Sequence, residues 1–189
     1  MVLKELNEKL NDSWIDTSDW GKSGTKDIKS LQQELQKWEC TLEVLDWVLT
    51  RVVSLVGVDI FHTDNNGIKY NLRETKQVLK NWTEEFKNYD HSVGEKMEWN
   101  ETPITAMRRW LRDVLDLKWF VDIKKWTHNR MSKLSTSYPG LTSQYVRYWF
   151  SAKLNNDQFK PEGYIEKQKD KTLYFEWNIV EELEDEVKK

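Results

Sequence analysis

The apolar positions of residues 27–56 form the clearest pattern in the chain. They recur at alternating intervals of three and four residues: Ile28, Leu31, Leu35, Trp38, Leu42, Leu45, Leu49, Val52 and Val56. A heptad spacing sustained over this length predicts one long helix that packs lengthwise against another, as in a coiled coil. The second half is apolar on most sides, which indicates burial by several neighbours. Residues 2–11 predict a short amphipathic helix before it.

A turn and a second long helix are predicted to follow. The dipeptide Asn66-Gly67 stands between the apolar runs Val58–Phe61 and Ile68–Leu72. It favours a β-hairpin, because both residues tolerate positive φ. Residues 72–89 return to the spacing of three and four, so we expect a helix that folds back along the first one.

The C-terminal half predicts two further helices and a hairpin. Thr102-Pro103 is a typical helix start, since Thr caps the first turn and Pro fits the first helical position. This helix either runs on to Ser135 or breaks within residues 118–122. After a Pro-Gly turn, Thr142 caps a predicted helix over residues 142–154. Residues 164–179 predict a β-hairpin, because apolar and polar side chains alternate along its second strand.

These elements together predict a mainly α fold. It consists of a helical hairpin or bundle with one or two small β-hairpins. We expect a coiled-coil-like helical hairpin region over residues 1–101 and a second helical region with a C-terminal β-hairpin over residues 102–179. Residues 180–189 form an acidic tail.

The order of elements over residues 104–179 resembles a winged helix-turn-helix domain. The order is helix, helix, Pro-Gly turn, helix and two-stranded wing, and the resemblance rests on this order alone. It implies that residues 142–154 are a recognition helix in the DNA major groove and that the wing touches the backbone or minor groove. The nucleic-acid-binding residues that it implies are Gln144, Arg147, Tyr148, Ser151 and Lys153 on the helix and Lys167, Lys169 and Lys171 on the wing. Winged helices also bind proteins, so the resemblance leaves the partner open.

The charge distribution is uneven. The formal charges of residues 1–103, 104–175 and 176–189 are −6, +7 and −4, against −3 for the whole chain. A basic block between acidic ones predicts a polyanionic partner, and chance clustering on solvated faces explains it equally well. For Arg108, Arg109 and Arg112 we favour a solvated face that pairs with Asp113, Asp116 and Asp122.

The sequence carries no motif for catalysis, cofactor binding or metal binding. The three histidines lie far apart, there are no paired cysteines, and no Gly-rich phosphate loop or Gly-x-Ser-x-Gly elbow occurs. Residues 62–73 match part of a calcium loop, but Arg73 stands where a bidentate Glu is required. We therefore predict no cofactor, no metal site, no small-molecule substrate and no enzymatic activity.

Composition predicts a folded protein in a reducing compartment. Eleven Trp residues argue against disorder, and the single cysteine, Cys40, cannot form an internal disulfide. No apolar stretch of transmembrane length occurs, so we expect a cytoplasmic protein without a membrane partner. We interpret Cys40 as a free thiol rather than a nucleophile.

The leading hypothesis is a non-enzymatic, DNA- or RNA-binding protein. Its basic C-terminal region would contact the nucleic acid, and its N-terminal helices would mediate protein–protein interaction or homo-oligomerisation. The alternative is a helical assembly or adaptor protein, such as a viral or phage accessory factor, that binds only proteins. An enzyme whose site assembles in space is the third interpretation.

Overall fold

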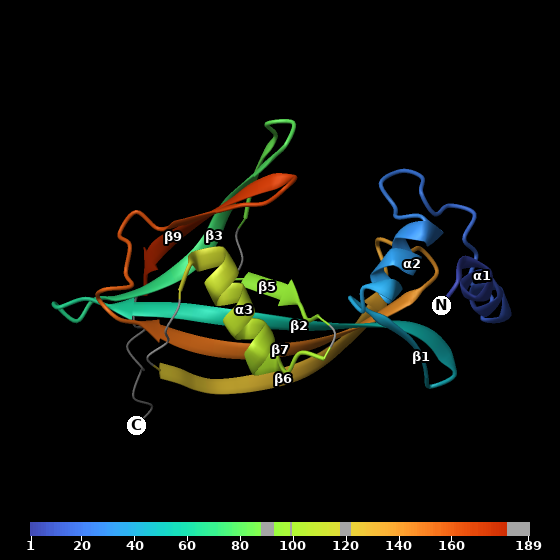
Figure 1. Ribbon diagram of the computed structural model, residues 1–189, viewed down its shortest axis with the longest axis horizontal. Coiled ribbons are helices and arrows are strands. Elements are labelled where there is room, and N and C mark those ends of the chain that lie inside the picture. The colour runs from blue at the N-terminus through green and yellow to red at the C-terminus, as the bar shows by residue number, and fades with distance from the viewer. Residues whose placement is uncertain (88–92, 99, 118–121, 181–189) are drawn as a thin grey trace, which may run out of the picture. The chain divides into compact units, whose positions relative to one another are not determined.

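The protein is mainly β (Figure 1). The computed structural model describes residues 1–87, 93–98, 100–117 and 122–180. Its helices are α1 (Leu3–Asp12), α2 (Ile28–Gln36) and α3 (Pro103–Leu115). Its strands are β1 (Thr41–Leu45), β2 (Val48–Thr63), β3 (Lys69–Leu79), β4 (Glu84–Phe86), β5 (Val93–Lys96), β6 (Asp122–Leu134), β7 (Thr142–Leu154), β8 (Tyr164–Lys167) and β9 (Lys171–Ile179). The prediction of a mainly α helical bundle is therefore wrong.

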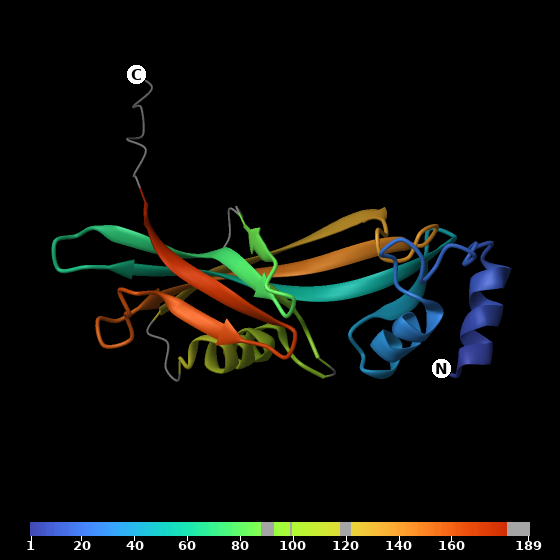
Figure 2. The same ribbon diagram turned by 90° about the horizontal axis from the view of Figure 1, so that it is seen from above.

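The nine strands of the described residues belong to one sheet. Hydrogen-bonded neighbours follow the order β6-β7-β2-β3-β9-β8, with β1 and β5 also paired to β2 and β4 paired to β3. Figure 2 shows β3, β9 and β8 side by side. Contacts divide the chain into two compact units. Unit 1 comprises residues 1–56, 95–106 and 127–148, and unit 2 comprises residues 57–94, 107–126 and 149–189.

The predicted long helix over residues 27–56 is wrong after its first third. Helix α2 ends at Gln36, and the chain then forms β1, a two-residue turn and β2. Asp46 and Trp47 make this turn with φ of 47° and 69°, so that Leu45 pairs with Val48. The segment beyond the turn is rich in β-branched residues, which favour strands. Positions seven apart lie on opposite faces of a strand, so residues at the heptad spacing do not form one continuous apolar surface in this segment.

The predicted helices over residues 72–89 and 142–154 are also wrong. The first segment forms β3 and β4, and the second forms β7. A spacing of four residues fits both a helix and a strand, because four is a multiple of the strand period of two. On β7, Val146, Phe150 and Leu154 are buried, and Ala152 completes the alternation. Without a recognition helix, the resemblance to a winged helix is overturned.

Other predictions are confirmed. The short helix predicted over residues 2–11 is present as α1, which begins at Leu3, and α3 begins at Pro103 with the Thr105 N–H donating to Thr102 Oγ1 at 3.3 Å. The hairpins at residues 62–67 and 164–179 are present as β2–β3 and β8–β9. Helix α3 ends at Leu115 and β6 begins at Asp122, so the helix does not run to Ser135. Residues 118–121 and most of the predicted acidic tail lie outside the described residues. The proposed domain boundaries remain predictions.

Each unit has its own core. In unit 1, α1 and α2 pack side by side (Figures 1 and 2). The core of unit 1 consists of Leu6, Leu10, Trp20, Leu31, Cys40, Leu49, Val53, Tyr138 and Leu141. In unit 2, α3 buries Met107, Leu111 and Leu115, and the Trp110 ring meets the Phe175 ring edge-on at 6.4 Å. Over the described residues, no helix combines the length and apolar character needed to cross a membrane.

Candidate functional site

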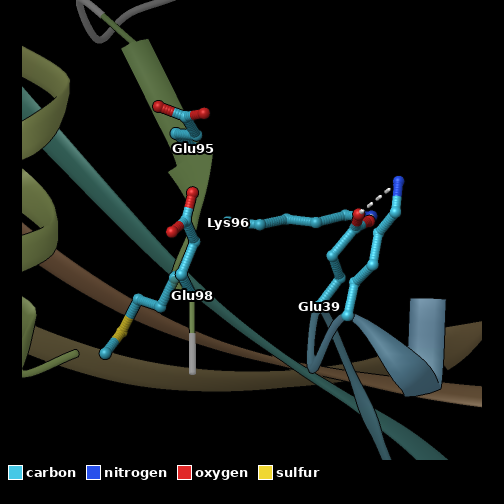
Figure 3. A pocket seen from close by; sticks show the side chains of 6 residues that line it. Glu39, Glu95, Lys96 and Glu98 are labelled. Carbon is cyan, nitrogen blue, oxygen red and sulfur yellow. Dashed lines mark hydrogen bonds and ion pairs between the residues drawn. The ribbon is translucent and has the colours of Figure 1, made fainter. Parts of the chain in front are cut away.

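Unit 1 contains a cavity of about 630 Å³ with a charged lining (Figure 3). Two residues that follow α2 line it on one side, and four residues at the end of β5 line it on the other. The lining residues are Lys37, Glu39, Glu95, Lys96, Met97 and Glu98. The lining thus carries three carboxylates and two ammonium groups, with one methionine as its apolar part.

The way α2 ends places Glu39 at this cavity. The Trp38 N–H donates to the Leu35 carbonyl at 3.2 Å, and the Glu39 N–H donates to the Glu34 carbonyl at 2.9 Å. These two bonds form a Schellman motif, whose turning residue adopts a left-handed conformation. Trp38 is that residue, with φ of 58°, at a position where glycine is the usual choice. The motif reverses the chain and directs Glu39 into the cavity lining.

The opposite side of the cavity is held by backbone hydrogen bonds. The Met97 N–H donates to the Ser54 carbonyl of β2 at 2.9 Å. The Glu98 N–H donates to the Glu101 carboxylate at 2.8 Å, and the Glu101 N–H donates to the Glu98 carbonyl at 3.2 Å. These bonds fix the segment that carries the Glu95 and Glu98 side chains, which Figure 3 shows on the β5 side.

Ion pairs join the two sides. The Lys96 side chain extends across the cavity toward Glu39 (Figure 3), with 2.9 Å between Nζ and Oε2. The same ammonium group lies 3.8 Å from Glu34 Oε1. Lys37 also contacts Glu39, at 4.0 Å. Both ammonium groups of the lining are therefore drawn to Glu39.

Behind the cavity, Glu34 is the centre of a buried polar cluster. Its carboxylate accepts hydrogen bonds from Lys26 Nζ at 2.6 Å, Arg51 Nε at 3.1 Å and the Tyr138 hydroxyl at 3.1 Å. The side chains of Glu34 and Arg51 are both only 6% exposed. The Arg51 guanidinium also lies 5.4 Å from the centre of the Tyr138 ring. Buried charges need such partners, and here each charge has them.

The cluster shifts the protonation of its members. Burial alone would raise the pKa of Glu34, but hydrogen bonds from Lys26 and Arg51 and the charge of Arg51 outweigh it, and the pKa falls to about 2. Burial, and then the charge of Glu34, raise the pKa of Tyr138. Burial also raises the pKa of Cys40 to about 11, so this thiol is a poor nucleophile.

The arrangement suits an organic cation better than a metal ion. Among the described residues, no group of three or more His, Cys, Asp or Glu side chains is placed to hold a metal. The carboxylates outnumber the ammonium groups of the lining, and the C-terminal end of α2 adds the negative end of a helix dipole. A protonated amine or guanidinium could therefore bind among the glutamates.

The predicted recognition-helix residues lie on strand β7. Gln144 donates to the Ser132 hydroxyl of β6 at 3.3 Å, the Arg147 guanidinium lies 6.0 Å from the centre of the Tyr145 ring, and Tyr148 stacks with His128 at 6.0 Å. Ser151 and Lys153 lie further along the strand. Side chains on a strand alternate between two faces, so these residues do not share the single face that a recognition helix would present.

The three predicted wing lysines lie around the β8–β9 turn of unit 2. Lys167 ends β8, Lys171 begins β9, and Lys169 stands between them. The structure brings Lys169 and Lys171 together in the lining of a second cavity of about 230 Å³, beside the exposed Trp82. The positions of these lysines and of the β7 residues do not test their predicted role in nucleic-acid binding.

Sequence reasoning missed the cavity because its two sides are far apart in the chain. Glu39 and Glu95 are separated by more than fifty residues, and no local motif connects them. The heptad interpretation also placed residues 38 and 39 in the middle of a helix. The signal that was available is the strand-forming character of residues 48–58, which would have ended that helix earlier.

Comparisons with known proteins find similarity in structure but none in sequence. No family model matches the chain, and no curated protein matches its sequence. The crystal structure of the Ap4A hydrolase from C. elegans aligns with 68% of this chain and 80% of its own chain, at 12% identity and a TM-score of 0.38. The fold itself contradicts the winged-helix resemblance, because residues 142–154 form strand β7 instead of a recognition helix. The hypotheses of a nucleic-acid-binding protein and of an adaptor that were built on predicted helices are therefore wrong in their structural basis. At this identity and TM-score, the similarity assigns no substrate or reaction to the chain.

Proposed function

We propose that unit 1 binds a small organic cation, such as a polyamine or a basic side chain, in its charged cavity. The observation that carries this proposal is the excess of carboxylates in a cavity of about 630 Å³ whose ammonium groups both contact Glu39. A cationic ligand would balance the lining, and an anionic ligand would add to its excess negative charge.

The cavity also offers the shape and chemistry that a flexible amine needs. Met97 provides an apolar contact for methylene groups, and Glu95 and Glu98 provide acceptors for N–H donors. Charge-assisted hydrogen bonds from ammonium to carboxylate are stronger than neutral ones, so two such contacts give both affinity and orientation.

Isothermal titration calorimetry with spermidine tests the proposal. We expect one site per chain, with binding that weakens as salt rises, because salt screens partly exposed charges. The double variant Glu95→Gln/Glu98→Gln should bind about thirtyfold more weakly, since it removes two partly exposed ion pairs that contribute on the order of 1 kcal/mol each. The matched control is Glu8→Gln/Glu43→Gln, which removes the same charge from exposed positions outside the lining and should leave binding unchanged.

Two results would overturn the proposal. One is the absence of spermidine binding at millimolar concentration and low salt. The other is equal competition by Mg²⁺ at matched ionic strength, which would reduce the cavity to a general acidic surface. If Glu8→Gln/Glu43→Gln weakened binding as much as Glu95→Gln/Glu98→Gln, the cavity would likewise be only part of a general acidic surface.

We further propose that the protein resides in a reducing, cytoplasmic compartment. The single thiol, Cys40, is buried in the core of unit 1, where it is free. Mass spectrometry of the protein isolated under thiol-blocking conditions should find Cys40 unmodified. Quantitative glutathionylation or a disulfide-linked dimer would contradict this.

A further inference from the structure

The part of β6 that belongs to unit 1 forms an exposed sheet edge. In the order of hydrogen-bonded strands β6 is terminal, and β7 is its neighbour (Figure 1). All eight residues from Thr127 to Leu134 are exposed, including the apolar Met131 and Leu134. An edge of this length and exposure presents a row of backbone groups to which another chain can add a strand.

The hydrogen bonds at the β6–β7 turn show which backbone groups face outward. The Ser135 N–H donates to the Leu141 carbonyl at 2.9 Å, and the side chains of Gln144 and Ser132 are hydrogen bonded across the pair. Backbone groups in an antiparallel pair alternate in direction along the strand. Those of residues 129, 131 and 133 therefore face β7, and those of Arg130 and Ser132 face the open edge.

The edge is cationic. Residues 127–134 contain Arg130 and Lys133 and no carboxylate. Within the part of the chain that the structure describes, neither cation forms an ion pair. Lys133 Nζ lies 5.4 Å from the centre of the Tyr145 ring on β7, and the Arg147 guanidinium lies 6.0 Å from the same ring. Cations on an edge strand can prevent unwanted pairing between like strands, and the same charges select a strand of opposite charge.

We propose that β6 binds an extended, acidic peptide segment of a partner protein as an added strand. The backbone groups of the edge would give the ladder of hydrogen bonds, and Arg130 and Lys133 would contact carboxylates on the two faces of the added strand. A second copy of β6 fits poorly, because antiparallel self-pairing brings the cations together. A nucleic acid fits poorly as well, because it has no backbone N–H and C=O ladder to match.

Fluorescence anisotropy with a labelled peptide of alternating Glu and Val residues tests the backbone contribution. Ser132→Pro removes an outward-facing N–H, and proline is tolerated on an edge strand where that N–H faces solvent. We expect this variant to keep the melting temperature of the parent but to bind the peptide at least about tenfold more weakly. Ser132→Ala is the matched control, because it removes the same hydroxyl but keeps the N–H. Equal binding by Ser132→Pro and the parent, or an equal loss in Ser132→Ala, would overturn the proposal.

A charge reversal tests the selectivity without depending on the proline variant. Arg130→Glu/Lys133→Glu should lose the acidic peptide and gain a peptide of alternating Lys and Val residues. Failure of the preference to invert would contradict the assignment. A different outcome is that the protein binds a labelled oligothymidylate but not the acidic peptide, and that Ser132→Pro leaves this binding intact. It would contradict strand addition and show that the edge binds polyanions by charge alone.

Discussion

Replacing Glu34 by Gln is expected to destabilise unit 1 strongly, and in a way that depends on pH. The carboxylate of Glu34 accepts hydrogen bonds from Lys26, Arg51 and Tyr138 and is almost fully buried. An amide at this position keeps the shape but removes the charge. The buried Arg51 guanidinium then loses its counter-ion. Removing one partner of a buried ion pair destabilises the folded state strongly, because the remaining charge is buried without compensation.

The magnitude follows from the pKa. Lowering the pKa of Glu34 from 4.5 to about 2 corresponds to about 3 kcal/mol of differential stabilisation of the charged form. Removing one partner of a buried ion pair typically costs about 3–5 kcal/mol, which agrees. Because the pKa is lowered in the folded state, this stabilisation is complete above pH 4.5 and is lost as pH falls toward 2. The difference between the parent and Glu34→Gln should therefore shrink from about 3 kcal/mol at pH 7 to about 1 kcal/mol at pH 2.5.

Urea unfolding followed by tryptophan fluorescence at several pH values between 7 and 2.5 measures this difference. Glu8→Gln is the control, since Glu8 forms an exposed i,i+4 pair with Lys4 at 3.8 Å, and such pairs contribute about 0.3–0.5 kcal/mol. A Glu34→Gln effect below about 0.5 kcal/mol at pH 7, within the range of surface substitutions, would refute the reasoning. So would a large effect that stays constant across the pH range.

Three other predictions concern single residues. Trp47→Gly should stabilise the protein by about 1 kcal/mol, because Trp47 is 98% exposed and holds a left-handed φ that glycine adopts without strain; a lower urea midpoint would contradict this. Gly57→Ala should destabilise by about 1–3 kcal/mol, because the new Cβ would lie 2.0 Å from the Trp149 ring, and an unchanged midpoint would show that the ring moves freely. Cys40 should react with a disulfide reagent at pH 8 only as fast as the protein opens, because burial raises its pKa to about 11; a rate like that of a small thiol would contradict the burial.

Sequence reasoning predicted the local features that a few residues determine. The Thr102-Pro103 helix start, the Asn66-Gly67 hairpin and the alternating β9 segment all formed as expected, because capping and turn chemistry act over short distances. It failed where the spacing was ambiguous. Positions four apart lie on one face of a helix and also on one face of a strand, so β7 was taken for a helix.

The turn at residues 46 and 47 explains the largest error. Two-residue hairpins favour Asn-Gly or Asp-Gly because both central positions need positive φ. Here Trp47 stands at the glycine position, so the usual signal is missing. Trp38 likewise replaces glycine at the end of α2. Because tryptophan occupies the glycine position at both chain reversals, the sequence shows no turn signal there. The apolar spacing of residues 28–56 therefore predicted one continuous helix.

The candidate site depends on long-range contacts that no local pattern contains. Glu39 reaches the cavity through the Schellman motif of α2, and Glu95 and Glu98 reach it through the end of β5. The buried partnership of Glu34 with Arg51 joins a helix to a strand. Charge counts over sequence blocks could not reveal these pairings, because a count says which charges are present but not which ones meet.

The most direct test of the account is a titration of the isotopically labelled protein with spermidine, followed by backbone amide chemical shifts. If the charged cavity of unit 1 is the binding site, the saturable shifts concentrate on residues 37–39 and 95–98, and Glu95→Gln/Glu98→Gln suppresses them. Shifts that scatter over exposed carboxylates throughout the chain and never saturate would contradict the claim that this cavity recognises an organic cation.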